Sequence, residues 1–291
     1  MLLSRRVHNT GLAGVQMVLN RLVEKSFLVR HVRMYGVVQD ERLTRSLLGV
    51  DSSHPRDTIA IVLHGQSHDE VGGRSFAVPS GHASLAPANS VSSSRSTNCE
   101  VLEIEWDPGT LGDGVGGAQV WSLGRSTLTA ASRLGGLLEQ RRTDAIPEAF
   151  ETLLRTFLSE GLPVETEAPF TPSTPADQRL LCALDASLQS LAQAPMLVDI
   201  EQALGLSRRT LARRVSTLHK DYRLTGRGRT WRELRDRYRI VVATILLSHG
   251  DATVSRIASL VGYTSTEALH HAFREVGLPS PGAYRKALLR A

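Results

Sequence analysis

The spacing of apolar residues changes along the chain and divides it into three stretches. In the first 110 or so residues, short apolar runs alternate with Gly, Pro, Asn and Ser, which is typical of short strands joined by turns. From residue 126 to residue 160, and again after residue 177, apolar residues recur at intervals of three and four. That spacing indicates amphipathic helices. Four prolines lie between the two helical regions, in residues 161–176, and predict an extended linker.

The first stretch predicts a meander of short strands, because four apolar runs are separated by turn-forming residues. The runs lie at residues 58–64, 75–78, 83–85 and 101–106. Closely spaced short strands favour a small barrel or jelly roll. The pattern before residue 50 is compatible with either strands or helices. Two helices follow, at residues 126–142 and 145–160, and Pro147 suits the first turn of the second.

The first recognisable helical motif lies at residues 198–215. A short helix with Ile200 on its apolar face ends at Gly205, a residue that adopts the left-handed conformation of a helix C-terminus at little cost. Ser207 can then cap a second helix by accepting hydrogen bonds from its free backbone N–H groups. The apolar face of that helix consists of Leu211, Val215 and Leu218. A helix, a glycine turn and a capped basic helix together predict a helix-turn-helix unit.

A second unit with the same pattern lies at residues 253–274. Gly262 makes the turn, Thr264 or Ser265 caps the next helix, and Leu269 and Phe273 face inward. A long helix at residues 231–248 would connect the two units. If that helix is rigid, the two recognition helices meet successive major grooves on one face of the duplex, about 34 Å apart.

Charge separates the two ends of the chain. Residues 176–291 hold 18 Lys and Arg against 10 Asp and Glu, and the remaining residues hold 16 against 19. A basic C-terminal region beside a slightly acidic N-terminal one fits a polyanion-binding module joined to a domain that does not touch the polyanion. A solvated basic surface is the alternative. The longest apolar stretch, residues 240–247, is far shorter than the roughly 20 residues of a membrane span.

This layout resembles the AraC/XylS family of transcription regulators over about residues 177–291. The most specific match is Ile257-Ala258 with Gly262-Tyr263, followed by Phe273 and by residues 281–285. The resemblance implies a sequence-specific regulator that is not an enzyme and needs no cofactor. It also implies a cupin-like N-terminal domain, double-stranded promoter DNA as a partner, and a second copy of the chain in a homodimer. A small-molecule effector, RNA polymerase contact in an activator, and a cytoplasmic location on the nucleoid are further expectations.

We therefore expect an α+β protein with an N-terminal small β-barrel and helices, and an all-α C-terminal domain with two helix-turn-helix units joined by a long helix. Residues 1–160 would form the effector-binding and dimerisation domain, 161–176 the linker, and 177–291 the DNA-binding domain. Ligand binding would favour the arrangement of DNA-binding domains that fits the promoter half-sites.

The resemblance also assigns roles by position. The expected base readers are Arg209, Arg213, Thr266, Glu267 and His271. Arg213 can bond guanine bidentately, Glu267 can accept from a cytosine amino group, and Thr266 can touch a thymine methyl. Phosphate contacts position the protein on DNA without reading its sequence. The expected ones are Ser207, Arg208, Arg214, Ser265, His270 and Arg274, and, on the charge of residues 219–230, also Lys220, Arg227 and Arg229.

Two features of the C-terminal region allow a second interpretation, and a third departs from the family. Residues 219–230 form a basic loop that either contacts phosphate or is a flexible solvated segment. His270 and His271 either face DNA or are ordinary surface residues. Glu201 stands where the family usually has a small alanine, so we expect the helices of the first unit to pack differently.

Other candidate chemistry is weaker. His64, His68 and His82 lack the paired His-x-His spacing of cupin metal sites, so we interpret them as surface or hydrogen-bonded residues. The two cysteines are expected to be reduced, residues 112–117 form a glycine-rich loop, and no nucleophile-base motif is present. Two rival hypotheses remain. In one, residues 1–160 serve only dimerisation or partner contact; in the other, a metal-dependent cupin enzyme is fused to the DNA-binding domain.

Overall fold

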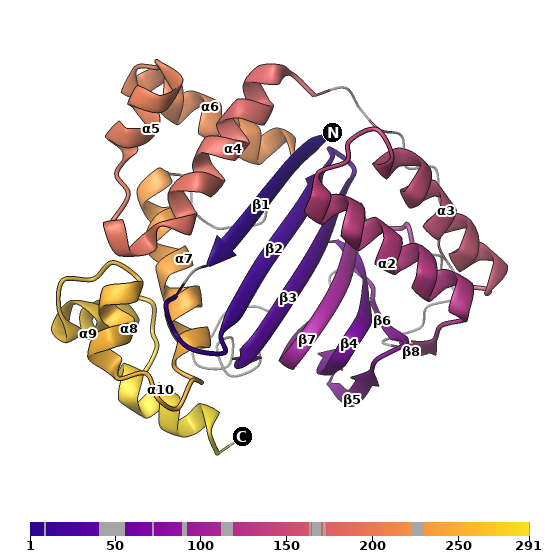
Figure 1. Ribbon diagram of the computed structural model, residues 1–291, viewed down its shortest axis with the longest axis horizontal. Helices are drawn as coiled ribbons and strands as arrows, with labels where there is room; N and C mark the ends of the chain where they lie inside the picture. Colours follow the sequence, from indigo (N-terminus) through magenta and orange to yellow (C-terminus); the bar gives the residue numbers. More distant parts are fainter. Residues whose placement is uncertain are drawn as a thin grey trace.

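A computed structural model describes residues 1–8, 10–40, 56–71, 73–88, 92–111, 119–162, 164, 170, 173–222 and 230–290. Within these ranges an antiparallel sheet comes first and helices follow (Figure 1), so the expected α+β class is confirmed. The strands are β1 (Leu2–His8), β2 (Gln16–Val23), β3 (Phe27–Asp40), β4 (Asp57–Val71), β5 (Arg74–Pro79), β6 (His82–Ala86), β7 (Ser92–Trp106) and β8 (Gln119–Ser122). The helices are α2 (Arg125–Gln140), α3 (Ile146–Ser159), α4 (Pro175–Gln189), α5 (Leu197–Leu204), α6 (Arg208–Asp221), α7 (Trp231–Leu246), α8 (Val254–Leu260), α9 (Thr266–Glu275) and α10 (Pro281–Leu288), with a 3-10 turn, η1 (Leu191–Gln193).

The strands form one sheet in the order β1-β2-β3-β7-β4-β6-β8, and β5 pairs with β4. All four predicted apolar runs lie in strands, in β4 through β7. The stretch before residue 50, which the sequence left open, contributes β1, β2 and β3. The ladder begins at β1 and ends at β8, and no pairing joins these two strands in the part of the chain that the structure describes. Among these residues the hydrogen-bonded path therefore runs from β1 to β8 as one continuous antiparallel sheet.

Both faces of strands β1 to β3 are buried. Because successive side chains of a strand point to opposite faces, Leu3 and Leu22 face the core under α2 and α3, whereas their neighbours Leu2 and Val23 face the C-terminal helices. The aromatic ring of Phe27 stacks on that of Phe150 from α3, with 4.8 Å between ring centroids. The sheet is thus a middle layer between two sets of helices (Figure 1).

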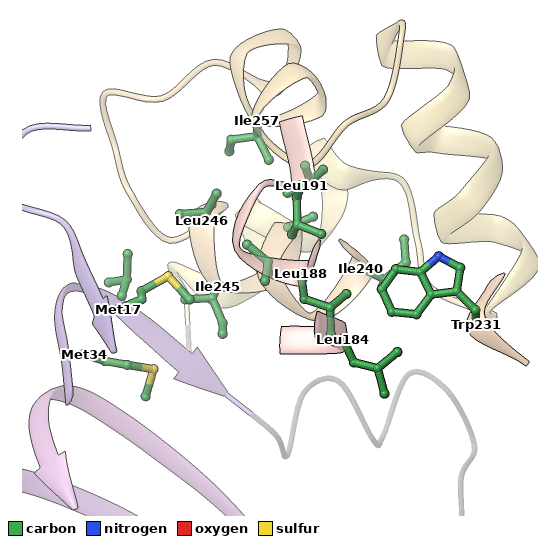
Figure 2. Close-up of a cluster of buried hydrophobic side chains, with 14 of the residues drawn as sticks. Met17, Met34, Leu184, Leu188, Leu191, Trp231, Ile240, Ile245, Leu246 and Ile257 are labelled. Atoms are coloured by element: carbon green, nitrogen blue, oxygen red, sulfur yellow. The ribbon is translucent and has the colours of Figure 1, made fainter. Parts of the chain in front are cut away.

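The C-terminal helices share a core with the sheet. The leucine stripe of α4 and η1 packs against α7 and against the first helix of the second helix-turn-helix unit. Figure 2 shows this cluster, in which Met17 and Met34 from the sheet approach Ile245 of α7. The fold therefore places both helix-turn-helix units on a common support. In the described ranges, no helix is both long and apolar enough to cross a membrane.

Candidate nucleic-acid interface

The first helix-turn-helix unit is built by the predicted local signals. Helix α5 ends at Leu204, and the next residue, Gly205, caps it with a φ of 62°, in the left-handed region that glycine adopts without strain. Ser207 then caps α6, since its hydroxyl accepts a hydrogen bond from the backbone N–H of Thr210. Leu211, Val215 and Leu218 are buried, so the opposite side of α6 faces away from the protein.

The second unit repeats this construction. Helix α8 is capped by Thr253 and ends at Leu260, and Gly262 makes the turn with a φ of 81°. Of the two predicted caps for the next helix, Ser265 is the one used: its hydroxyl accepts from Ala268 N–H at 3.1 Å. Leu269 and Phe273 are buried, as expected.

Arg209 and Arg213 occupy the outward face of α6. A helix has 3.6 residues per turn. On α6 this spacing puts Arg209, Arg213 and Lys220 on the side opposite to the buried Leu211 and Val215. All three are exposed. Arg208 and Arg214 lie on the two flanks of this face. This arrangement puts the two expected base readers where a groove would meet the helix, with expected phosphate contacts beside them.

Arg208 has a partner within the unit. Its Nε donates to Oε1 of Glu201 on α5 at 3.1 Å, so the carboxylate that replaces the family's small residue links the two helices. Elsewhere on α6, Arg209, Arg213 and Arg214 have no ion pair or hydrogen bond within the described ranges. Three guanidinium groups are therefore available to bind an anion.

Helix α9 presents a different surface. Glu267 and His271 point away from the buried face and are exposed, whereas Thr266 is only half-exposed and lies at the flank nearest the core. His271 is held on both ring nitrogens: Arg274 donates to its Nδ1 at 2.9 Å, and its Nε2 lies 3.1 Å from Glu275. The outward face of α9 thus carries two carboxylates, Glu267 and Glu275, against one guanidinium, and His271 is hydrogen-bonded between Arg274 and Glu275.

The two recognition helices differ in charge. Helix α6 carries five Lys and Arg against one Asp, and α9 carries one Arg against two Glu. The pKa of Glu267 is lowered by hydrogen bonds from its own backbone N–H and from Ser265, so this carboxylate is ionised near neutral pH. An ionised carboxylate at a groove can accept from a cytosine amino group but repels phosphate.

Some predicted residues take other roles or lie outside the described residues. The hydroxyls of Ser207 and Ser265 are engaged as helix caps, and His270 is exposed on a flank of α9. Arg227 and Arg229, with most of the basic loop, lie outside the described residues. In the N-terminal region His64 and His68 are exposed, in agreement with their interpretation as surface residues. Among the described residues, no three metal-ligating side chains group together.

Arg239 of α7 is a buried residue that sequence reasoning missed. Its guanidinium lies over the ring of Tyr263, with 5.4 Å between Cζ and the ring centroid, and its Nη1 is 3.7 Å from Asp236. The contact fixes the turn of the second unit against the connecting helix. The only hint in the sequence is that Tyr263 directly follows the turn glycine.

Sequence comparisons with known proteins identify a helix-turn-helix domain in the same region. A family model described as a helix-turn-helix domain covers residues 200–287. A Streptomyces lividans protein named as an AraC-like transcription regulator is 37% identical over 112 residues, which are 38% of this chain and 34% of that protein. The HTH-type transcriptional regulator RipA of Corynebacterium glutamicum is 30% identical over 114 residues, 39% of this chain and 32% of that protein. Each match therefore spans about a third of the relative's length.

Solved structures are more distant. ToxT from Vibrio cholerae O395 is 15% identical, with 90% of this chain and 98% of that chain covered at a TM-score of 0.36. The AraC-like transcriptional activator CuxR is 14% identical, with 75% and 80% covered at a TM-score of 0.30. These TM-scores are too low to imply a shared function. The family model and the two sequence relatives nevertheless agree with the two units seen in the structure, and the C-terminal third of the chain carries a helix-turn-helix domain of the AraC type.

Proposed function

We propose that this protein is a sequence-specific DNA-binding transcription regulator that binds double-stranded DNA through both helix-turn-helix units. The observation that carries the proposal is the outward face of α6, where Arg209 and Arg213 are exposed and unpaired among the described residues, on a helix of the AraC type. An α-helix fits the major groove, and guanidinium groups can bond both guanine edges and phosphates.

The two units contribute differently in this proposal. Helix α6, with its excess of positive charge, supplies most of the attraction to phosphate. Helix α9 adds selectivity, because the carboxylate of Glu267 can accept a hydrogen bond only from a base with an amino group in the major groove, such as cytosine. Arg209, Arg213, Glu267 and His271 read bases, and Thr266 contributes from the flank of α9. The expected phosphate contacts keep their assignments, with Arg208 and Arg214 at the flanks of α6.

Selection of duplexes from a random pool by the full chain tests the proposal. Arg213→Ala should lose discrimination at one or two base pairs of the selected site, by roughly 1 to 3 kcal/mol. Arg214→Ala should instead weaken binding to all sequences about equally and lower the salt dependence by about one phosphate contact. Arg155→Ala on α3 is the control, because it removes the same charge from an exposed side chain far from α6 in the sequence. An Arg213→Ala protein with unchanged sequence preference contradicts the base-reading role.

For the N-terminal region we infer the functions that the resemblance implies. Residues 1–160 would bind a small-molecule effector and form a homodimer, residues 161–176 would link them to the DNA-binding domain at 177–291, and RNA polymerase would be a partner in activation in the cytoplasm. In the rival hypothesis these residues serve only dimerisation or partner contact, without any ligand. Leu158 on α3, which is 54% exposed, is a candidate for the dimer contact in either case. A metabolite screen by thermal shift separates the two, and Leu158→Glu followed by sedimentation tests the dimer.

A further inference from the structure

A buried polar cluster joins the sheet to the C-terminal helices. Asp185 of α4 forms ion pairs with two arginines of the sheet. Its Oδ1 lies 2.5 Å from Nη2 of Arg6 on β1, and its Oδ1 and Oδ2 accept hydrogen bonds from Nη2 of Arg21 on β2 at 2.6 and 2.8 Å. The guanidinium of Arg6 also lies over the ring of Tyr238 on α7, with 4.7 Å between Cζ and the ring centroid. The hydroxyl of Tyr238 is hydrogen-bonded to His8. One cluster therefore holds α4 and α7 to the same two strands.

The cluster lies in the interior. The side chain of Asp185 is 2% exposed, and those of Arg6 and Arg21 are 11% and 13% exposed. Burial alone would raise the pKa of Asp185, but the charges of Arg21 and Arg6, with hydrogen bonds from Ser4 and Arg21, lower it to about 2. The ion pairs are thus fully formed near neutral pH. Removing the carboxylate would leave two buried guanidinium groups without a counter-charge, which is far more disruptive than losing an exposed pair.

Further contacts attach the end of α7, which leads into the second helix-turn-helix unit, to the same part of the sheet. The backbone N–H of Val38 in β3 donates to the hydroxyl of Ser248, just after α7, at 2.7 Å. His249 is hydrogen-bonded to the carbonyl oxygen of Ala13, in the connection between β1 and β2, at 3.3 Å. Helix α4 in turn packs against α5 of the first unit. Strands β1 to β3 are therefore connected to the first unit through α4 and to the second through the end of α7.

We propose that Asp185 is a positioning residue for DNA recognition, through which the N-terminal sheet sets the spacing between α6 and α9. The sheet fixes the positions of α4 and α7, and these two helices support the two recognition helices; we call this part of the sheet the brace. The N-terminal domain then determines which separation between two base-pair segments the protein accepts. This inference rests on the proposed DNA-binding function. It adds a structural reason why the protein would bind only sites in which the two base-pair segments have one particular separation.

A spacing series measures this role directly. The probe is the duplex that the unmodified full chain selects, with one to five base pairs inserted between its two contacted segments. Because the brace is rigid, the unmodified protein should lose at least about tenfold in affinity when two base pairs are inserted. Asp185→Asn keeps the side-chain shape and removes the charge. It should bind the original duplex more weakly and lose less than about threefold on the same insertion, because the two units can then move relative to each other.

The controls separate positioning from folding. Glu151→Gln makes the same change of net charge at an exposed pair on α3 and should leave the spacing profile unchanged. Tyr238→Phe removes only the hydroxyl from the cluster, and it serves as the deciding variant if Asp185→Asn does not fold. A folded variant with the spacing profile of the unmodified protein overturns the inference while the proposed function stands. If the unmodified protein enriches no duplex at all, the proposed function fails and the inference fails with it.

Discussion

The turn at Gly262 holds the second helix-turn-helix unit against η1, and replacing this glycine with alanine tests that packing. The added methyl carbon would lie 2.1 Å from the carbonyl oxygen of Leu191 in η1 and 2.8 Å from Nη2 of Arg239. Contacts this short with backbone cannot be relieved by a side-chain rotation. The residue also has a φ of 81°, which an alanine adopts only with strain.

The expected loss of stability has two parts. The left-handed backbone conformation costs an alanine about 1 to 2 kcal/mol. Forcing an extra carbon into a packed contact costs typically about 1 to 3 kcal/mol more. Gly262→Ala should therefore lower the free energy of unfolding by about 2 to 5 kcal/mol, and it should weaken DNA binding because α9 must shift away from η1.

Gly205, at the equivalent turn of the first unit, provides the matched control. Its φ is 62°, but nothing lies within 4 Å of the position an added methyl carbon would take. Gly205→Ala should cost only the conformational part, about 1 to 2 kcal/mol. Guanidinium unfolding followed by circular dichroism gives both values. Equal losses for the two variants would refute the packing of Gly262 against Leu191 as the source of the extra cost.

Two further predictions follow from single contacts. Glu201→Gln breaks the ion pair with Arg208 and leaves this guanidinium free to contact a DNA phosphate. DNA titrations at several salt concentrations should show tighter binding, and the dependence of affinity on salt should be steeper by about one phosphate contact. An unchanged salt dependence would show that Arg208 does not reach phosphate. Burial, with the charge of Arg6, lowers the pKa of His8 to about 4. Between pH 6.5 and 4 the unfolded chain therefore binds a proton at His8 that the native protein does not bind. As pH falls through this range, the free energy of unfolding should decrease by about 3 kcal/mol. His8→Asn should flatten that part of the stability profile, and a profile as steep as that of the unmodified protein would contradict the burial of a neutral imidazole.

The helix-turn-helix units could be predicted from sequence because their signals are local. A glycine at the turn and a serine two or three residues later define where each helix ends and the next begins, and the structure uses Gly205, Ser207, Gly262 and Ser265 in these roles. Thr266 was harder to place. Because Ser265 is the cap, Thr266 is the first residue of α9 and falls on the flank nearest the core.

The first three strands could not be predicted with the same clarity. An antiparallel strand with one solvated face alternates apolar and polar residues, but β1 to β3 are covered by helices on both faces. Their apolar residues therefore run together, as in the neighbours Leu2 and Leu3 or Leu22 and Val23. Which helices cover them depends on contacts between residues far apart in the sequence.

The buried cluster at Asp185 shows the same limit. An aspartate beside Leu184 in a leucine stripe is unusual, and that is the only local signal for it. Its partners, Arg6 and Arg21, lie more than 160 residues earlier in the chain. Sequence spacing carries no information about such a pairing, so the link between the two parts of the protein emerges only from the structure.

Footprinting of the full chain on the duplex that it selects from a random pool tests the central claim most directly. Two helix-turn-helix units on one support predict two protected segments on the same face of the DNA, with centres about one helical turn, 34 Å, apart. Arg213→Ala should alter the sequence of one segment and Glu267→Gln that of the other. A single protected segment, or no enriched duplex, would contradict the claim that both units bind DNA together.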